Sequence, residues 1–295
     1  MSAETVASAK PEAPAPRGER FWRMPILVWL AAGFLVLVAV IAVFAQVLMP
    51  YGYEDTNLLY RLKPPFWSSL SIEGHVLGTD KLGRDLLSRL LVATQVSIAL
   101  ALMGTLIGAV LGTVLGVLAA HYGRLVDEIV MMLVDWQAAM PFLIIALAVL
   151  AFFGNNFYLF LALMGLAGWE TYARLTRGLV LSAKEQGYAV AVRALGARPW
   201  RLYTHHILPN VVGPLIVQLT LNFPQTILLE TSLSFLGLGI QPPLTSLGQM
   251  LGEGRDYLLT SWWLAVIPGA VIFITTLSMS LFGDWLRTRL DPTQR

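Results

Sequence analysis

The chain has 295 residues, of which 56% are hydrophobic and 13% are charged, and its mean hydropathy is +0.67. Because a soluble domain carries roughly 25% charged residues, this composition excludes a water-soluble globular protein and predicts an all-α polytopic membrane protein. The net charge is +2 and cysteine is absent, which excludes disulfides and thiolate metal sites. The four His residues are scattered, so no metal site is predicted.

Six runs with few charges are long enough to cross a bilayer, which takes about 20 residues of helix. The first, 25–49, follows a tail (1–24) that is rich in Ala, Pro, Glu and Lys and is predicted to be disordered. It exceeds the apolar run of about 7–15 residues in a cleaved signal peptide, so we predict a retained anchor. Five further spans form a core (91–285) ahead of a short tail (286–295), and they are predicted within 90–120, 129–153, 157–173, 211–235 and 261–283.

The segment between the first two spans, residues 50–90, is predicted to lie on the outer, periplasmic side of the membrane. Its dense group of glycine, aspartate and arginine indicates a fixed turn held by ion pairs, followed by a helix that enters the membrane. Substrate binding here is the alternative interpretation. The residues concerned are Gly78, Thr79, Asp80, Gly83, Arg84, Asp85 and Arg89.

Glycine recurs at every fourth position of the second predicted span, and Ala120 continues the row. On a helix this spacing makes a smooth stripe that another backbone can approach closely. Ordinary packing inside the bundle is the favoured interpretation, and a face that slides during a conformational cycle is the alternative. The stripe consists of Gly104, Gly108, Gly112 and Gly116.

Three predicted spans contain a carboxylate, which is costly in a membrane and requires a partner. Asp135 lies near the inner end of the third span, where it can pair with an arginine or reach the interface. Glu170 is four residues from Arg174, a spacing typical of a helical ion pair. Glu230 lies toward the outer part of the fifth span. We favour structural pairing over a proton relay through the three groups.

Residues 182–210, here called the coupling segment, form a basic stretch between the fourth and fifth spans. Ser182 and Glu185 match a capping box, which predicts a helix to Leu195 that ends at Gly196. A second short helix is predicted from Pro199, with Pro209 closing the segment. Its predicted apolar face consists of Trp200, Tyr203, Ile207 and Leu208. Two capped helices at a glycine corner indicate that a partner docks there.

The segment 237–261 ends before a Trp262–Trp263 pair and contains several glycines and prolines. This pattern fits a re-entrant or interfacial turn with an aromatic anchor. A gate at the outer end of a transport pathway is an equally weighted alternative.

The positive charges predict the orientation of the chain. Lys and Arg total 20, and only six lie in predicted outer segments: Arg61, Lys63, Lys81, Arg84, Arg89 and Arg255. The other fourteen lie in predicted inner segments. Because cytoplasmic segments carry the excess of Lys and Arg, both termini and the coupling segment are predicted to be cytoplasmic.

Several catalytic and nucleotide-binding motifs are absent from the sequence. There is no G-x-x-x-x-G-K-[ST], no H-E-x-x-H and no G-x-S-x-G. We therefore predict that the chain is not an enzyme and that any ATP-driven step belongs to another subunit.

The motifs resemble those of ATP-binding-cassette importer permeases. The coupling segment is similar to the signature E-A-A-x3-G-x9-I-x-L-P at Ala191, Gly196, Leu208 and Pro209, whereas Val190 departs from its first position. The outer motif H-x-L-G-T-D-x-x-G-R-D-x-x-S-R is matched from His75 to Arg89, as in the second ("C") permease of dipeptide, oligopeptide and nickel importers. Further matches are R-A-L-G-A (193–197), H-I-L-P-N (206–210), L-S-F-L-G-L-G (233–239), W-W (262–263), P-G (268–269), G-D-x-L-R (283–287) and L-D-P (290–292).

This resemblance implies a type I importer permease with six transmembrane helices in a bacterial inner membrane. It implies a second homologous permease, two ATPase subunits that bind ATP and magnesium, and a periplasmic or lipid-anchored solute-binding protein. No cofactor is implied for this chain. The residues implied to couple it to the ATPase are Glu185, Ala191, Arg193, Ala194, Leu195, Gly196, Ala197, Arg198, Trp200, Arg201, Leu208 and Pro209.

Substrate is the least determined property. Di- and oligopeptides are the first expectation from the resemblance, with nickel chelates or another small solute as the alternative. A secondary transporter or channel is the rival class. It requires inverted repeats, matching broken helices or a charged filter, and the sequence shows none of these.

Overall fold

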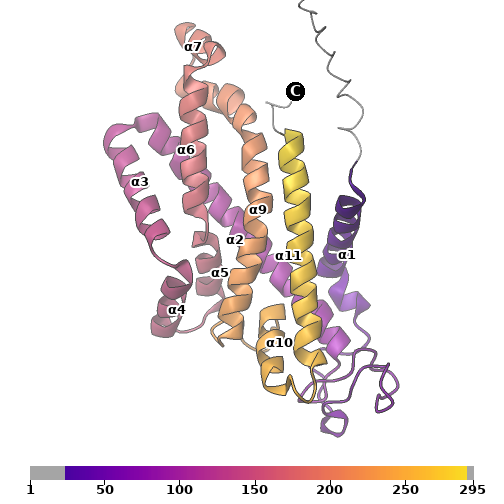
Figure 1. Cartoon of the computed structure of the whole chain (residues 1–295). Helices are drawn as coiled ribbons and strands as arrows, with labels where there is room; N and C mark the ends of the chain where they lie inside the picture. The colour runs from indigo at the N-terminus through magenta and orange to yellow at the C-terminus, as the bar shows by residue number, and fades with distance from the viewer. Residues whose placement is uncertain (1–23, 291–295) are drawn as a thin grey trace, which may run out of the picture.

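The computed structural model describes residues 24–290. The predicted disordered tail (1–24) lies almost wholly outside this range, as do residues 291–295 of the predicted C-terminal tail and part of the 290–292 motif. Regular structure in the described part of the chain is helical, apart from one isolated bridge between Thr79 and Asp85. The all-α prediction is confirmed. The helices form an elongated bundle with α7 at one end and α10 at the other (Figure 1).

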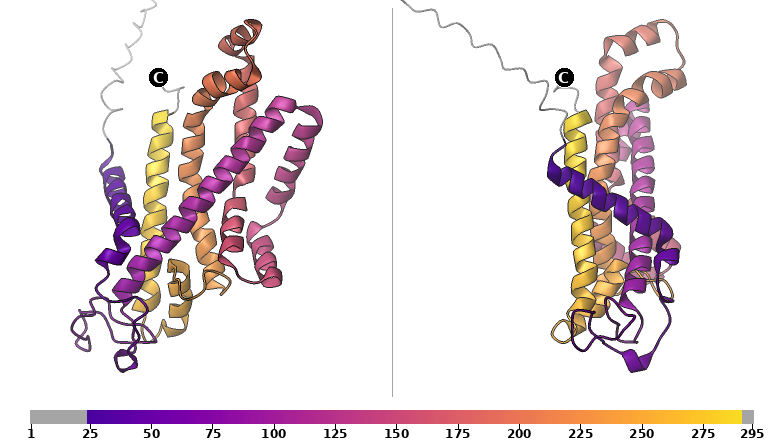
Figure 2. Two further views of the ribbon diagram at one scale, coloured as in Figure 1. Left: turned by 180° about the vertical axis from the view of Figure 1, so that it is seen from behind. Right: turned by 90° about the vertical axis from the view of Figure 1, so that its right-hand side faces the viewer.

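Four continuous helices are long and apolar enough to cross a membrane: α1 (Ile26–Leu48), α2 (Leu86–Tyr122), a 37-residue helix (Pro199–Phe235) that contains α9 (Leu208–Phe235), and α11 (Trp263–Leu290). Helix α2 begins before the predicted core boundary at residue 91, and α11 extends into the predicted tail from residue 286. Helix α1 crosses the bundle diagonally over α11 (Figure 2).

The third and fourth predicted spans are each interrupted, so neither is a single continuous helix. Helices α3 (Arg124–Ala139) and α4 (Phe142–Phe153) meet at an angle of 89°. Pro141 follows the break and has no N–H for a continuous helix. Counting this bent pair as one span gives up to five spans by length and composition.

The fourth predicted span covers α5 (Phe157–Leu166) and the start of α6 (Trp169–Glu185), which are separated at Ala167–Gly168. Gly168 has φ of +84°, a left-handed conformation that glycine adopts without strain. A Cβ there would also lie 2.6 Å from the Asn222 amide nitrogen. Gly168 therefore explains the break, because it takes the left-handed turn and leaves room for the Asn222 side chain.

The capping box predicted at Ser182 and Glu185 does not start a helix in the structure. Ser182 lies within α6, which continues to Glu185, and α7 (Gly187–Ala194) begins after Gln186. The buried face of α6 continues through Val180 and Ala183, so packing favours a continuous helix over a new start at Ser182. This is tertiary packing overriding a local capping signal.

Beyond α7 the chain forms α8 (Pro199–Leu202) and a π-helical turn (Tyr203–Ile207) that leads directly into α9. Pro209 therefore lies in the first turn of α9 and does not close the segment. Helix α10 (Leu247–Gly254) lies between α9 and α11 at the opposite end of the bundle (Figure 1).

The glycine stripe of α2 packs against α5 and α6. An added Cβ would lie 2.7 Å from Met164 Cβ at Gly104 and 2.9 Å from the Gly165 carbonyl oxygen at Gly108. At Gly116 it would lie 2.8 Å from Thr176 Cβ. The stripe thus places the α2 backbone in direct contact with α5 and α6, which is the packing arrangement favoured from the sequence.

Candidate functional site

The glycine corner after α7 is a Schellman motif. Gly196 has φ of +76° and donates its N–H to the Arg193 carbonyl at 3.0 Å, while the Ala197 N–H bonds the Val192 carbonyl at 3.3 Å. These two bonds satisfy carbonyl groups that a helix end leaves without partners. The corner is therefore a defined turn, with Pro199 opening α8 directly after it.

The corner exposes large apolar side chains on its outer side. Leu195 is 87% exposed and Trp200 is 77% exposed. Together with Gly196, Arg198 and Arg201, among others, they line an open hollow of about 630 Å³. The inner side is anchored by buried Ala189, Leu202 and Ile207, which pack with α6 and α9.

Trp200 does not share a buried face with Ile207, contrary to the prediction for the second short helix. Leu202 takes the buried position in α8. The π-helical turn Tyr203–Ile207 holds one more residue per turn than an α-helix, so a face drawn with a 3.6-residue period goes out of register there.

Two basic side chains tie the corner to the rest of the bundle. Arg193 Nη2 donates to the Lys184 carbonyl at 3.1 Å, and Lys184 Nζ donates to the Ala120 carbonyl at the end of α2 at 2.7 Å. Partial burial and the nearby Arg193 charge lower the pKa of the Lys184 ammonium. Arg193 thus braces α7 against α6 and does not project freely like Arg198 and Arg201.

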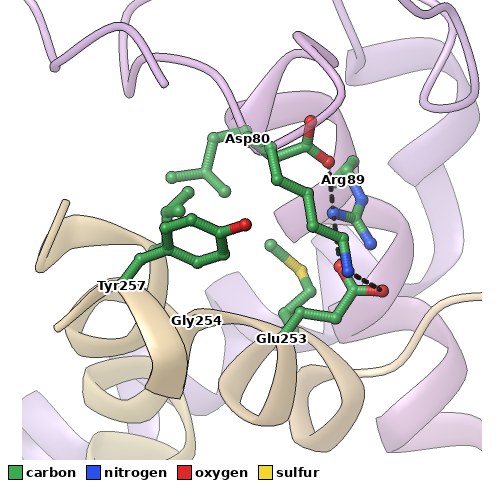
Figure 3. A pocket seen from close by; sticks show the side chains of 9 residues that line it. Asp80, Arg89, Glu253, Gly254 and Tyr257 are labelled. Carbon is green, nitrogen blue, oxygen red and sulfur yellow. Dashed lines mark hydrogen bonds and ion pairs between the residues drawn. The ribbon is translucent and has the colours of Figure 1, made fainter. Parts of the chain in front are cut away.

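The opposite end of the bundle carries a buried ion cluster between the α1–α2 segment and α10. Arg89 Nη1 lies 2.6 Å from Asp80 Oδ2 and 3.1 Å from Glu253 Oε2. Arg84 Nε contacts Asp80 at 2.7 Å. Asp80, Arg89 and Glu253 point toward one another beside Tyr257 (Figure 3). The space that they help to enclose is only about 10 Å³, the size of about one water, so it holds no substrate.

The backbone reinforces this cluster. Asp80 also accepts the N–H groups of Leu82 and Arg84, at 2.8 and 2.9 Å. Burial raises the pKa of the Asp80 carboxyl, but the charges of Arg89 and Arg84 and the two N–H donors outweigh it, so the pKa lies below its ordinary value of 3.8. Asp80 is therefore ionised at neutral pH.

The other motif residues of the α1–α2 segment complete the turn. Gly78 and Gly83 both have positive φ, +81° and +73°. Asp85 caps α2 by accepting the Ser88 N–H at 2.7 Å and also lies 2.9 Å from His75 Nδ1. The Thr79 N–H bonds the Lys63 carbonyl at 3.0 Å.

Two carboxylates within the predicted spans have polar partners on neighbouring helices, and one of the two pairings differs from the prediction. Asp135 pairs with an arginine, as predicted, and that arginine is Arg174 at 2.8 Å. Glu170 instead accepts a bond from Gln137 Nε2 at 2.8 Å, and Trp169 Nε1 donates to Gln137 Oε1 at 2.7 Å. The predicted pair of Glu170 with Arg174 is thus replaced by a polar cluster that joins α3 to α6 at the α5–α6 break.

Comparison with known proteins places this geometry in a family. Residues 112–295 match the family model described as "Binding-protein-dependent transport system inner membrane component". The chain belongs to this family. Residues 21–65 of the permease also match the model "N-terminal TM domain of oligopeptide transport permease C". The permease is thus a multi-pass inner-membrane component of an ATP-binding-cassette importer.

Curated relatives cover most of both chains. The permease is 38% identical over 259 residues to the di/tripeptide transport system permease protein DppC of Pseudomonas aeruginosa, covering 88% of this chain and 86% of the relative. It is 38% identical to the glutathione transport system permease protein GsiD of Pectobacterium atrosepticum, covering 92% and 90%. It is 35% identical to the oligopeptide transport system permease protein OppC of Bacillus subtilis, covering 88% and 84%.

A solved structure supports the fold. An inward-facing form of the MetNI methionine ABC transporter matches with a TM-score of 0.54 and 19% identity, covering 69% of this chain and 96% of that chain. At this identity the match establishes only the fold, which is that of an importer permease.

Most predicted coupling residues of the permease meet at one exposed corner. Ten of them lie between the end of α6 and α8: Glu185, Ala191, Arg193, Ala194, Leu195, Gly196, Ala197, Arg198, Trp200 and Arg201. Leu208 and Pro209 lie beyond the π-helical turn in α9. Sequence analysis missed Lys184 as a brace and Glu253 as the third member of the ion cluster.

Proposed function

We propose that this permease is the C-type half of a short-peptide importer and pairs with a second, different permease chain. Its α7 end faces the cytoplasm and receives an ATPase subunit, which binds ATP and magnesium. Its α10 end faces the binding protein that delivers the peptide. The permease itself carries no catalytic residue and no cofactor. The excess of Lys and Arg in segments near the α7 end supports this orientation.

The exposed glycine corner is the observation that carries this proposal. Leu195 lies before the 37-residue helix Pro199–Phe235 and Trp200 lies in its first turn, at the end of the bundle, and both are large exposed apolar groups. Leaving them in water is unfavourable unless a partner covers them. Arg198 and Arg201 lie beside them around the same hollow. An apolar centre with a charged rim is typical of a protein interface, and Trp and Arg often dominate binding energy.

The bonding of the corner explains how movement of an ATPase reaches the spans. Arg193 joins α7 to α6, and Lys184 joins α6 to the end of α2. On the other side, α8 continues through the π-helical turn into α9. A push on the corner would therefore act on α6, α2 and α9 together, as a rigid-body transition requires.

Short peptides are the substrate class that the relatives favour. The three relatives above are named for di/tripeptides, glutathione and oligopeptides. We therefore assign peptide transport to the permease. Competition of labelled dipeptide uptake by unlabelled peptides, but not by free amino acids, tests this assignment independently of the docking surface.

The docking surface is tested by co-purification of the ATPase subunits with a tagged permease. We expect Leu195→Asp combined with Trp200→Ala to lose the ATPase and peptide uptake while the chain remains in the membrane. Leu259→Asp is the matched control, because Leu259 is fully exposed at the opposite end, and it should retain the ATPase. Undiminished ATPase co-purification with the double variant would refute the docking assignment.

A further inference from the structure

Glu230 is a carboxyl group at the meeting point of α2, α9 and α10, and its exposed fraction is 0%. The Ser97 hydroxyl of α2 donates to Oε2 at 3.2 Å, and the Ser234 hydroxyl of α9 donates to Oε1 at 2.7 Å. Ser97 Oγ also accepts the Leu247 N–H in the first turn of α10 at 3.0 Å. The carboxyl group is thus linked through a serine to the start of α10.

Ser246 extends this hydroxyl cluster. It caps α10 by accepting the Gln249 N–H at 3.2 Å, and its hydroxyl lies 3.4 Å from Ser234 Oγ. Ser97, Ser234 and Ser246 are all buried. Three elements therefore meet through hydroxyl groups around one carboxyl group.

No ion pair to Glu230 occurs within the described part of the chain. Helix α2 contributes Arg89 near this end, and Arg89 pairs with both Asp80 and the Glu253 of α10. Arg255, just after α10, lies over the Phe235 ring of α9 and pairs with Asp256. Helix α9 carries no other charged residue, and the charged residues of α11 lie in its last two turns, residues 284–290. The neighbours of Glu230 thus supply hydroxyl groups and no neutralising cation.

An ionised carboxylate is poorly supported in such surroundings. Moving a charge out of water is costly, and hydroxyl donors alone recover only part of that cost. A neutral carboxylic acid fits the same cluster without this cost. Protonation of Oε1 reverses the two hydroxyl groups that now point toward it: the acid proton is donated to Ser234 Oγ, and Ser234 donates to Ser246 Oγ. Ser97 still donates to the other carboxyl oxygen.

We propose that Glu230, Ser97, Ser234 and Ser246 form a proton-binding site that fastens α10 to α2 and α9. The ligand is one proton held as a carboxylic acid at neutral pH. Loss of this proton creates a buried charge beside the start of α10 and weakens the attachment of α10 to the bundle. This proposal depends neither on the identity of the substrate nor on the docking surface at the α7 end.

Infrared spectroscopy of the assembled importer in lipid nanodiscs tests the proposal directly. At neutral pH the wild-type protein should show the carbonyl stretch of a protonated carboxylic acid, shifted in D2O, and Glu230→Gln should lack it. Asp256→Asn is the control, because Asp256 is an exposed carboxylate, and it should retain the band. Ser234→Ala should move the band to a different frequency. Absence of the band in the wild-type protein, or its persistence in Glu230→Gln, overturns the proposal.

Thermal unfolding provides a second readout. Glu230→Gln imitates the neutral acid and should unfold near the wild-type temperature, whereas Glu230→Ala should unfold at least about 5 °C lower. A native state that holds a proton released on unfolding loses stability as the pH rises. The wild-type midpoint should therefore fall relative to Glu230→Gln as the pH is raised from about 6 to about 9. A wild-type midpoint that instead rises specifically with added sodium or potassium indicates an ionised cation site and contradicts the proposal.

Discussion

Gly112 shows how a single hydrogen atom in place of a side chain determines helix packing in this permease. An added Cβ at this position would lie 2.6 Å from Tyr172 Cβ and 3.0 Å from the Ala173 nitrogen. Both atoms belong to α6 and cannot withdraw as the tip of a flexible side chain can. Close approach of α2 and α6 therefore requires glycine here.

Gly112→Leu should destabilise the permease by about 1–3 kcal/mol through overpacking. The measurement is the midpoint of thermal unfolding in detergent. Gly33→Leu in α1 is the matched control, since no atom lies within 4 Å of a Cβ at Gly33, and it should leave the midpoint unchanged. Equal effects of the two substitutions would show that Gly112 has no special packing role.

Arg89 depends on its acidic partners because its side chain is buried. Asp80→Asn removes the charge that lies 2.6 Å from Arg89 Nη1. Breaking a buried pair in this way costs about 3–5 kcal/mol, so we expect a clear fall in the unfolding midpoint. Asp256→Asn removes an exposed pair with Arg255 and should have little effect. Similar midpoints for both variants would contradict a stabilising role for the cluster.

The stability contributed by Asp80 has a defined pH dependence. Its pKa is lowered below 3.8 in the folded protein, so the contribution is fully present above that value and is lost as the pH falls through the lower, folded pKa. The difference in unfolding midpoint between wild type and Asp80→Asn should stay constant near neutrality and narrow only below about pH 4. If this difference in unfolding midpoint already becomes smaller as the pH falls from about 8 to about 6, a different titrating group is responsible.

At the scale of elements, the α7–α8 corner depends on one left-handed residue. Gly196→Pro removes the N–H that bonds the Arg193 carbonyl and cannot adopt φ of +76°. We expect it to abolish peptide uptake while the chain remains in the membrane. Gly196→Asn is the matched control, because asparagine tolerates this conformation, and it should retain uptake. Normal peptide uptake by Gly196→Pro would show that the corner is not needed to couple the ATPase to transport.

Local signals made this corner predictable from the sequence. Glycine at the helix end and proline at the next helix start act within a few residues, and both Gly196 and Pro199 occupy the predicted positions. The capping box at Ser182 and Glu185 was also local, but the buried face at Val180 and Ala183 extends α6 through it. The spacing of residues in the sequence does not show whether a capping signal or tertiary packing decides where a helix ends.

Non-local contacts account for most of what sequence analysis missed. Glu253 is 164 positions from Arg89, and Gln137 is 33 positions from Glu170, so neither pairing has a periodic or motif signal. The bend between α3 and α4 was missed because Pro141 lies inside an apolar run that hydropathy treats as uniform. The long spans α1, α2 and α11 were predictable because apolar length alone indicates them.

At the scale of the whole molecule, α2 links both ends of the permease. Arg89 and Ser97 contact α10 or the residues just before it at one end, and the Ala120 carbonyl accepts the Lys184 bond at the other. Between them the glycine stripe holds α6 in direct backbone contact. A movement imposed at the α7 end therefore has a continuous structural route to the α10 end.

The role of this chain as an ATP-driven importer permease is tested most directly by reconstitution in proteoliposomes that contain the permease, its partner permease and the ATPase subunits. We predict uptake of labelled short peptide that requires ATP, the binding protein and this chain together, and that stops when any one is omitted. Peptide uptake by this chain alone, driven by a proton gradient without ATP, would contradict the assignment as an importer permease.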